Sequence, residues 1–447
     1  MASIATNRIA SCYIVKHMTK LTPLPDTGKP KVVIIGGGFA GLKLAKSLAS
    51  TEVQVVLIDK NNYHTFQPLL YQVATSGLNG ASIAYPFRKF FEKQQNFFFR
   101  LSEVRSVETN AKILTTSIGE LPYDFLVIAT GAETNFFGNE LMQKNAIALK
   151  SISDAVMLRN TILCNLENAL QAQDEAQLNL LMDFVIVGGG PTGVELAGAL
   201  SELRKHVFPK DYKELNIKQM DINLIQSGDQ LLKGMSAEAS EKSLKFLENY
   251  GVKVWLNSRV KSYDGTTVTL ASGEELKAQT LIWTAGVVGS PVKGLSEECV
   301  TKGNRILVNQ YNQVNGYEDI FAIGDVACMV TDEYPEGHPM IAQPAIQQGK
   351  LLAKNLDRMM SGQQPKPFSY YDQGSMATIG RNHAVADLIM FKRQFKTQGF
   401  LAWLIWMFIH LISIISFKNR LIVLLNWMSG YFSYDKGIRL ILGKKKE

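Results

Sequence analysis

Cysteine is scarce in this chain, and the cysteines that it has are far apart. The 447 residues include four, Cys12, Cys164, Cys299 and Cys328, with no CxxC pair and no Cys/His cluster. This spacing argues against a disulfide scaffold, a zinc ribbon and an iron–sulfur site, and we expect no metal site. It also suggests a reducing compartment.

Charge is sparse over most of the chain and is concentrated at its C-terminal end. Charged residues are 19% and apolar residues 46% of the sequence, a balance that excludes a disordered chain. Residues 385–447 hold ten Lys/Arg and three Asp/Glu, a difference of +7 that equals the net charge of the whole chain. A neutral body with a basic, apolar tail favours an anionic lipid surface as partner. No signature of base reading or RNA stacking is present, so we expect no nucleic acid partner.

The N-terminal segment lacks the features of a secretory signal. Residues 1–30 are polar and contain no apolar core of signal-peptide length. Their basic residues outnumber the acidic ones, which is compatible with a transit peptide, and Met18 is an alternative start. We expect 1–30 to be a disordered extension outside the fold.

A pattern of strand, glycines and helix begins at Lys31. The apolar run Lys31–Ile35 is typical of a buried parallel strand, and the glycine-rich segment 36–41 and a helical stretch to Ser50 follow it. A second apolar strand, Val53–Ile58, ends at Asp59. These elements predict one βαβ unit.

The same pattern returns later in the chain. The strand Asp183–Val187 precedes a second glycine-rich segment, 188–193, and a helix that includes Glu195. Asp221–Ile225 is the next apolar strand, and it ends at Gln226. The repeat predicts an α/β fold with two Rossmann-type dinucleotide-binding domains.

The glycine motifs have a mechanical reason. In G-x-G-x-x-G the first glycine makes a tight turn, the second lets the backbone approach a pyrophosphate, and the third lets helix pack on strand. The N-terminus of the helix then presents unpaired N–H groups to the phosphates. A structural glycine turn is the alternative, but each motif here follows an apolar strand and opens a helix.

The residue at the end of the second strand separates the two motifs. Asp59 is placed to bind both ribose hydroxyls of a dinucleotide. The matching position in the second motif is Gln226, which can bind a 2′-hydroxyl but would not repel a 2′-phosphate. The pattern therefore favours NADH as the substrate but does not exclude NADPH. Because of the inserted helix before Asp221, the assignment of Gln226 to this position also stays open.

Two other segments have the form of flavin contacts. Asp124–Gly131 is a strand that ends in a small-residue turn, and Asp319–Asp325 is a strand that ends in Gly-Asp. The second would place one carboxylate near a ribityl or phosphate group. The alternative for Asp325 is a helix N-cap.

Together these motifs carry a resemblance that spans nearly all of residues 31–440. The chain resembles the type II (alternative, non-proton-pumping) NADH dehydrogenases, the single-subunit NADH:quinone oxidoreductases of respiratory membranes. The matching segments, in the order of that family, are GGGFAGL at 36–42, HTFQPLLYQVATSGL at 64–78, ATGAETNFFG at 129–138, GGGPTGVELAGAL at 188–200, WTAGV at 283–287, FAIGDVA at 321–327, AQPAIQQG at 342–349 and the apolar, basic tail. The glycine motifs are shared by many relatives of the flavin disulfide reductases, whereas AQPAIQQG with the tail is more specific.

The resemblance implies a non-covalent FAD, NADH as substrate and a membrane quinone as acceptor. FAD would lie on Gly36, Gly38, Phe39, Ala40, Gly41, Asp59, Lys60, Val104, Ala129, Thr130, Gly131, Gly324, Asp325, Ala342 and Gln343. NADH would lie on Gly188, Gly190, Pro191, Thr192, Gly193, Glu195, Gln226, Ala285 and Gly286. The quinone would lie against Tyr71, Thr75, Gln343 and Gln347.

Two of these residues are implied to be catalytic. Gln343 can offer an N–H to a quinone carbonyl, which gains negative charge on reduction; the alternative is a helix start with satisfied amides. Glu195 would lie by the nicotinamide and the flavin, with a coupling to quinone protonation left open. Its alternative is stabilisation of the helix N-terminus.

The C-terminal tail predicts contact with a membrane. Residues 400–417 form a run of eighteen without charge, slightly short of the ~20 that a spanning helix needs. Several features favour helices that lie in the membrane interface over a single span. They are the aromatic residues Trp403, Trp406, Trp427, Tyr431 and Tyr434, a thin polar stripe of His410, Ser413 and Ser416, and the flanking Lys and Arg residues.

These inferences predict a division of the chain and a location. We expect an extension at 1–30, an FAD-binding domain split between 31–150 and 296–384, an NADH-binding domain at 151–295 and a membrane-binding region at 385–447. We expect a homodimer bound to the cytoplasmic face of a bacterial inner membrane, with the matrix side of a mitochondrial membrane as the alternative. The choice between menaquinone and ubiquinone stays open.

Three rival functions are weighed against this one. A sulfide:quinone oxidoreductase needs a cysteine pair by the flavin, and the four cysteines form no evident pair. A soluble flavin reductase for a protein carrier would not need the apolar tail. A non-catalytic nucleotide-binding membrane protein would have no use for Glu195 and AQPAIQQG.

Overall fold

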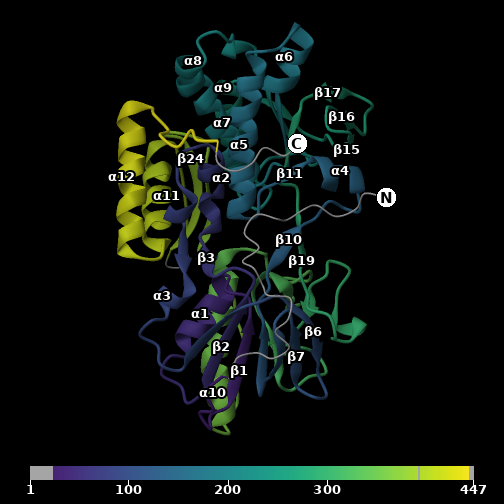
Figure 1. Ribbon diagram of the computed structural model, residues 1–447, viewed down its shortest axis with the longest axis vertical. Coiled ribbons are helices and arrows are strands. Elements are labelled where there is room, and N and C mark those ends of the chain that lie inside the picture. The colour runs from purple at the N-terminus through teal and green to yellow at the C-terminus, as the bar shows by residue number, and fades with distance from the viewer. Residues whose placement is uncertain (1–23, 391–392, 442–447) are drawn as a thin grey trace. The chain divides into compact units, whose positions relative to one another are not determined.

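A computed structural model describes residues 24–390 and 393–441 of the chain, which divide into two units (Figure 1). Unit 1 contains the described residues up to Asn62, together with Phe91–Gly131 and Gly289–Ser369. Unit 2 contains Tyr63–Phe90, Ala132–Val288 and the described residues from Tyr370 onward. Most of the predicted extension 1–30, with Met18, and Lys444–Lys446 lie outside the described residues.

Unit 1 is built on a parallel sheet of five strands in the order β21-β9-β1-β2-β5. Its strands are β1 (Lys31–Ile35), β2 (Gln54–Asp59), β5 (Phe97–Leu101), β9 (Phe125–Ile128) and β21 (Ile320–Ala322). The predicted strands at 31–35 and 53–58 are therefore present, and they pair in parallel from Lys31 with Gln54 to Ile35 with Ile58. Valine and isoleucine fill the centre of the sheet, because branched side chains pack well between two covered faces.

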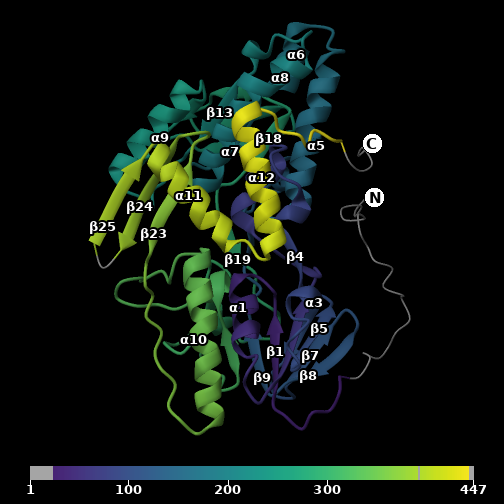
Figure 2. The same cartoon turned by 90° about the vertical axis from the view of Figure 1, so that its left-hand side faces the viewer.

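Two helices of unit 1 pack side by side. They are α1 (Phe39–Ser47) and α10 (Ala342–Met360) (Figure 2). Gly349 permits the close approach, since a Cβ there would lie 2.5 Å from the carbonyl oxygen of Ala40. The smaller elements of unit 1 are β6 (Val104–Glu108), β7 (Ile113–Thr116), β8 (Gly119–Pro122), β20 (Ile306–Leu307) and β22 (Ala327–Cys328).

Unit 2 contains a second five-stranded parallel sheet, in the order β11-β18-β12-β13-β14. Its strands are β11 (Ile147–Ala148), β12 (Phe184–Val187), β13 (Ile222–Ile225), β14 (Lys253–Trp255) and β18 (Thr280–Trp283). The helices of this part are α4 (Glu140–Asn145), α5 (Ile152–Ala169), α6 (Glu175–Met182), α7 (Pro191–Glu202), α8 (Phe208–Asp211) and α9 (Ala237–Asn249). The two parallel sheets confirm the predicted α/β fold.

An antiparallel sheet and two helices complete unit 2. The strands are β23 (Gly374–Thr378), β24 (Ala384–Met390) and β25 (Arg393–Gln398), and α11 (Phe400–Ser413) and α12 (Phe417–Ser433) follow (Figure 2). Ala384, Ala386 and Leu388 of β24 pack against Ala402 of α11. The remaining short elements are β3 (Tyr63–Thr65), α2 (Leu70–Ala74), β4 (Ala84–Pro86), α3 (Phe87–Phe90), β10 (Ala132–Thr134), β15 (Val260–Tyr263), β16 (Thr267–Leu270), β17 (Glu275–Lys277) and β19 (Val287–Gly289).

Candidate functional site

The first glycine loop of unit 1 has the form of a nucleotide cradle. Gly36 has a φ of +99°, and a Cβ there would lie 2.4 Å from the carbonyl oxygen of Ala129. A Cβ on Gly41 would lie 2.0 Å from the carbonyl oxygen of Gly36. Gly38 is different, because nothing lies within 4 Å of the position of its Cβ. Gly36 and Gly41 thus let the helix and the strands approach closely, whereas Gly38 leaves the space in front of the helix N-terminus open.

Asp59 closes this loop from the end of β2. Its carboxylate accepts a hydrogen bond of 2.7 Å from the backbone N–H of Gly37 and another from the N–H of Asn61. Burial raises the pKa of this carboxyl, and the two backbone hydrogen bonds oppose that rise. Lys60, the next predicted residue, is exposed.

The other residues predicted for FAD also belong to unit 1. Thr130 donates its hydroxyl hydrogen to the carbonyl oxygen of Ser290 at 2.6 Å, so this hydroxyl serves the turn itself. Gly131 has a φ of +73° and open space at its Cβ position. Val104 begins β6, and Ala342 and Gln343 begin α10.

The turn at Gly324 reveals a residue that the sequence did not single out. The backbone N–H of Gly324 donates a hydrogen bond of 2.7 Å to the side-chain oxygen of Gln348, and Gln348 is buried. Gln348 therefore holds the Gly324-Asp325 turn from α10. Its neighbours in AQPAIQQG, Gln343 and Gln347, are half-buried on the same helix.

The second glycine loop, in unit 2, repeats the construction of the first. Gly188 has a φ of +115°, and a Cβ there would lie 2.8 Å from the backbone nitrogen of Ala285. A Cβ on Gly193 would lie 1.9 Å from the carbonyl oxygen of Gly188, whereas the Cβ position of Gly190 has nothing within 4 Å. Gly190 is the N-cap of α7, and the exposed Pro191 and Thr192 form its first turn.

Gln226 occupies the same place in this loop as Asp59 does in the first. Its side-chain oxygen accepts a hydrogen bond of 2.9 Å from the backbone N–H of Gly189. The pairing of Val187 with Ile225 places Gln226 directly after β13, as the pairing of Ile35 with Ile58 places Asp59 at the end of β2. The equivalence that the sequence left open is thus settled by position.

This equivalence predicts the effect of Gln226→Glu on nucleotide choice. The variant keeps an oxygen that can accept from Gly189, but it adds a negative charge that would repel a 2′-phosphate. We expect the ratio of kcat/KM for NADPH to that for NADH to fall by about tenfold or more. An unchanged ratio would show that the 2′ position does not face Gln226. Gln171→Glu, on an exposed residue of the same unit, is the control.

The turn after β18 contains the last two residues predicted for NADH, Ala285 and Gly286. Gly286 has a φ of +120°, and a Cβ there would lie 3.1 Å from the ring of Phe137. Phe137 itself has a φ of +51° and is 62% exposed. An exposed aromatic ring therefore covers the backbone of this turn.

Glu195 lies one turn into α7 and is almost completely buried, with 7% of its surface exposed. Its carboxylate accepts a hydrogen bond of 3.4 Å from the backbone N–H of Thr378. Burial raises its pKa to about 8, and the hydrogen bond from Thr378 opposes the rise. A carboxyl group at this position is mainly protonated at pH 7 and can act as a proton donor.

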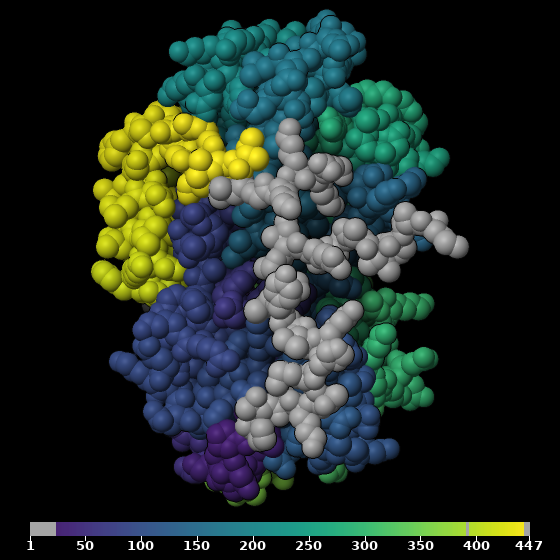
Figure 3. Space-filling view, viewed as in Figure 1, coloured from purple at the N-terminus to yellow at the C-terminus, as the bar shows by residue number. Residues whose placement is uncertain are grey.

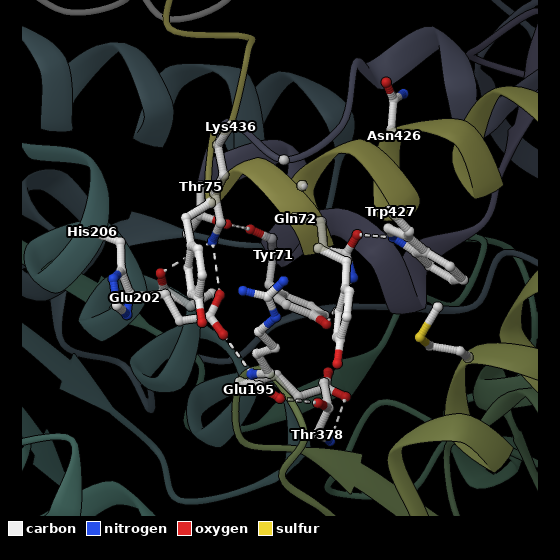
Figure 4. A pocket seen from close by; sticks show the side chains of 18 of the residues that line it. Tyr71, Gln72, Thr75, Glu195, Glu202, His206, Thr378, Asn426, Trp427 and Lys436 are labelled. Carbon is white, nitrogen blue, oxygen red and sulfur yellow. Dashed lines mark hydrogen bonds and ion pairs between the residues drawn. The ribbon is translucent and has the colours of Figure 1, made fainter. Parts of the chain in front are cut away.

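A cavity of about 150 Å³ lies in unit 2 next to Glu195. Its walls come from α2, α7, the turn between β23 and β24, α11, α12 and the segment after α12. Figure 4 shows Glu195 beside Thr378, with Glu202 and His206 along one side and Gln72 and Trp427 along the other. Both residues predicted for the quinone from α2 and its end, Tyr71 and Thr75, are in the lining.

Hydrogen bonds order one side of this cavity. Trp427 donates its indole N–H to the side-chain oxygen of Gln72 at 2.7 Å, and the amide of Gln72 donates to the hydroxyl of Tyr71 at 2.9 Å. The hydroxyl of Thr75 donates to the backbone carbonyl of Tyr71. The sequence did not single out Gln72, although it lies inside the motif HTFQPLLYQVATSGL. Gln343 and Gln347, the other two residues predicted for the quinone, belong to unit 1 and not to the lining.

The aromatic residues of the tail have a position that the sequence did not predict. Trp403, Trp406, Trp427, Tyr431 and Tyr434 all line the cavity, and Trp406 is only 2% exposed. Of the predicted polar stripe, Ser413 is exposed, whereas His410 and Ser416 are half-buried. His410 stacks on Trp406, its burial lowers its pKa to about 4, and Ser416 lies between the two helices. The reason is that α11 and α12 turn one face toward the cavity, and the aromatic residues are used there.

The helices α11 and α12 belong to the yellow part of the surface in Figure 3, and their exposed large side chains are mostly aliphatic or phenylalanine. The exposed residues of this surface, which we call the apolar face, are Phe400, Leu401, Leu404, Phe408, Ile412, Phe417, Leu421, Leu425, Met428 and Phe432. No helix in the part of the chain that the structure describes combines the length and apolarity needed to cross a membrane.

The described residues contain no group of three or more His, Cys, Asp or Glu side chains that could hold a metal ion. Cys164, Cys299 and Cys328 are free thiols, so they provide no disulfide for a rival sulfide chemistry.

Comparison with known proteins gives two family matches. Residues 30–349 match the model of the pyridine nucleotide-disulphide oxidoreductases, and residues 372–433 match the NDH2 C-terminal domain. Together they include both glycine loops and most of the segments that line the cavity.

Three curated relatives align over most of this chain. The type II NADH:quinone oxidoreductase Ndh of Mycobacterium tuberculosis is 33% identical over 91% of this chain and 89% of its own length. The type II NADH:quinone oxidoreductase of Staphylococcus aureus is 30% identical over 80% of this chain and 89% of its own. The mitochondrial internal alternative NAD(P)H-ubiquinone oxidoreductase A1 of Arabidopsis thaliana is 29% identical over 92% and 86%.

Solved structures share the fold. NDH2 from Plasmodium falciparum in complex with NADH superposes with a TM-score of 0.84, at 21% identity, over 93% of this chain and all of that one. The sulfide:quinone oxidoreductase of Aquifex aeolicus gives a TM-score of 0.70 at 20% identity, over 90% and 95%. At such identities the likeness shows the fold alone.

Proposed function

The chain belongs to the type II NADH:quinone oxidoreductase family, and we propose that it oxidises NADH at the second glycine loop and reduces a quinone in the cavity of unit 2. The reaction is NADH + H⁺ + quinone → NAD⁺ + quinol, with no proton pumping. We infer a non-covalent FAD at the first glycine loop. When bound, FAD accepts a hydride from NADH and delivers the electron pair to the quinone.

The course of α7 is the observation that carries this proposal. The helix begins at Pro191, directly after Gly190 of the second glycine loop, and continues through Glu195, Ala199 and Glu202, which line the cavity. One helix therefore connects the nucleotide loop with a protonatable carboxyl and an aromatic pocket. A flat, apolar quinone ring suits a pocket with walls of tryptophan and tyrosine.

The FAD assignment is supported by the first glycine loop. The open position at Gly38 and the N-terminus of α1, which has no side-chain cap, suit a pyrophosphate, and Asp59 suits a ribose. We propose that the other residues of unit 1 that were predicted for FAD also contact FAD. We also propose the division of the chain into FAD-binding, NADH-binding and membrane-binding parts that the sequence predicts. The contact of Gln343 and Gln347 with the quinone stays a prediction from the sequence, since both residues belong to unit 1.

Two half-reactions test the proposed function. The purified holoprotein is mixed with NADH without oxygen, and flavin absorbance is followed before and after a soluble quinone is added. NADH should bleach the flavin and the quinone should restore it. A flavin that ignores NADH but bleaches with sulfide would point to the sulfide chemistry. A flavin that NADH bleaches and only a protein carrier restores would point to a soluble reductase, and one that responds to nothing would mean a non-catalytic role.

The apolar face supports attachment to a lipid surface. Ten large apolar side chains stand out from α11 and α12, and Lys418 and Arg420 lie next to them at the start of α12. Such a face can lie in the interface of an anionic bilayer. We propose a monotopic protein on the cytoplasmic face of a bacterial inner membrane, with a mitochondrial membrane as the alternative, since relatives of both kinds align. The homodimer stays a prediction from the sequence.

Charge on the apolar face should release the protein from lipid. Phe408 and Phe432 are 64% and 78% exposed, so their replacement by Asp should leave the fold unchanged. We expect each replacement to weaken binding to anionic vesicles by about tenfold or more, because burial of one phenylalanine contributes roughly 1.5–3 kcal/mol. Co-sedimentation measures the effect. Leu141→Asp, exposed on α4 and outside the predicted membrane-binding region, is the control, and an equal loss for this control would contradict the assignment.

A further inference from the structure

We propose that Arg381 is a catalytic residue of quinone reduction, whose guanidinium donates a hydrogen bond to a quinone oxygen and stabilises the negative charge that this oxygen gains. The proposal rests on the proposed function, in which the cavity of unit 2 is the quinone site. Neither the sequence motifs nor the candidate residues predicted from them included Arg381.

Arg381 is held in the wall of the cavity by two aromatic rings. It lies in the turn between β23 and β24, and it lines the cavity. Its guanidinium carbon lies 3.9 Å from the ring centroid of Tyr431 and 3.9 Å from that of Tyr434. A cation between two rings keeps its charge and loses little freedom when it forms a further hydrogen bond.

The guanidinium of Arg381 makes no ion pair among the described residues. Its Nη1 atom is buried and has no hydrogen-bond partner there. The carboxylate of Glu202 makes other contacts. One of its oxygens accepts a hydrogen bond from the backbone N–H of Arg381, and the other pairs with Lys436 at 3.3 Å. A buried charged donor without a partner is costly, so its retention indicates a partner that is present only in the complex.

The other titratable groups of the cavity do not neutralise this charge. Asp435 pairs with Arg439, and Lys436 with Glu202. Glu195 is mainly protonated at neutral pH, since burial raises its pKa, and burial lowers the pKa of His206, which leaves that ring mainly neutral. Among the described residues of the lining, Arg381 is therefore the basic side chain that makes no ion pair with a carboxylate.

Quinone reduction creates charge that Arg381 can stabilise. Two electrons from NADH and two protons convert the quinone to the quinol, and one of the protons comes from solvent. Arg381 supplies neither electrons nor protons to this reaction. Its hydrogen bond is stronger to an oxygen with negative charge than to the neutral carbonyl, so it favours the transition state over the bound quinone.

Three variants test the assignment: Arg381→Gln, Arg381→Lys and, as control, Arg259→Gln on an exposed arginine of unit 2 outside the lining. We expect Arg381→Gln to lower kcat/KM for a soluble quinone by about ten- to a hundredfold, the range for a hydrogen bond to a charged group. Arg381→Lys should recover part of this loss, because it keeps the charge. The control should match the wild type.

Two further measurements separate catalysis from folding. Bleaching of the flavin by NADH and the midpoint of thermal unfolding should be unchanged in Arg381→Gln. Quinone binding is followed without turnover by quenching of the tryptophans, three of which line the cavity. Its Kd should change less than kcat/KM does.

Several results would overturn the role of Arg381. They are wild-type kcat/KM in Arg381→Gln, equal losses in the Lys and Gln variants, or a loss matched by slower bleaching or a lower unfolding midpoint. A different result would show that the proposed function itself is wrong. In that case NADH would bleach the flavin of the wild-type protein, and no quinone would restore its absorbance.

Discussion

A Gly190→Val variant should fold like the wild-type protein and oxidise NADH about a hundredfold less efficiently. Nothing lies within 4 Å of the Cβ position of Gly190, and its φ of −76° and ψ of −179° suit valine. The Cβ of the added side chain therefore clashes with no protein atom. It occupies the space that a pyrophosphate needs at the N-terminus of α7, and a displacement of about 1 Å can cost about a hundredfold in rate.

Gly38→Val provides the matched comparison in the first loop. Gly38 has the same open surroundings and a φ of −66°. This variant should lose FAD on purification, whereas Gly190→Val should retain it and fail to bleach with NADH. Kinetics with NADH, flavin content and thermal unfolding measure the three effects.

A control and a contrast complete this experiment. Gly303→Val, on an exposed glycine of unit 1, should change none of these properties. Gly193→Val should instead destabilise the protein, because a Cβ there would lie 1.9 Å from the carbonyl oxygen of Gly188. Wild-type kinetics in Gly190→Val would remove the second loop as the NADH site.

Glu195→Gln should slow quinone reduction about a hundredfold and remove its dependence on pH near 8. The carboxyl is buried, which raises its pKa to about 8, so it holds a proton through the neutral range. A positioned acid commonly contributes about a hundredfold or more. The wild-type rate should fall as the pH rises through about 8, and the variant should show no such fall, as steady-state rates from pH 6 to 9 would reveal.

The same substitution should change stability with a definite sign. Below about pH 4.5 the group is protonated in the folded and unfolded chain alike, so it contributes no difference. As the pH rises from there to about 8, the unfolded chain loses the proton and the folded chain keeps it, so the wild type loses stability. Glu195→Gln removes this loss, and its advantage should reach the order of a few kcal/mol above pH 8.

Thermal unfolding of both proteins at pH 5 and pH 9 measures that advantage. Glu248→Gln, on an exposed residue of α9, is the control and should show no advantage at either pH. Equal unfolding midpoints of the wild type and Glu195→Gln at pH 9 would mean that the carboxyl is solvated and not the proton donor that we propose.

The sequence alone determined the two nucleotide loops. The strands, the glycines and Asp59 are local in the chain, and Gly41 and Gly193 have their reason within one strand–turn–helix unit. For the same reason the fold class and the family could be recognised before any contact was known. The register of Gln226 depended on an inserted helix, and only the pairing of β12 with β13 and the hydrogen bond to Gly189 decided it.

The cavity depended on the tertiary structure, because residues far apart in the chain form it. Tyr71, Glu195, Arg381 and Trp427 come from four segments, and no spacing in the sequence brings them together. The tertiary structure also set the chemistry: burial raises the pKa of Glu195, and two tyrosine rings hold the guanidinium of Arg381 in place. The tail is a second example of what the sequence could not determine. Its aromatic residues suggested a membrane interface, and the packing of α11 and α12 showed that these residues line the cavity. The apolar face is left on the outside of the two helices.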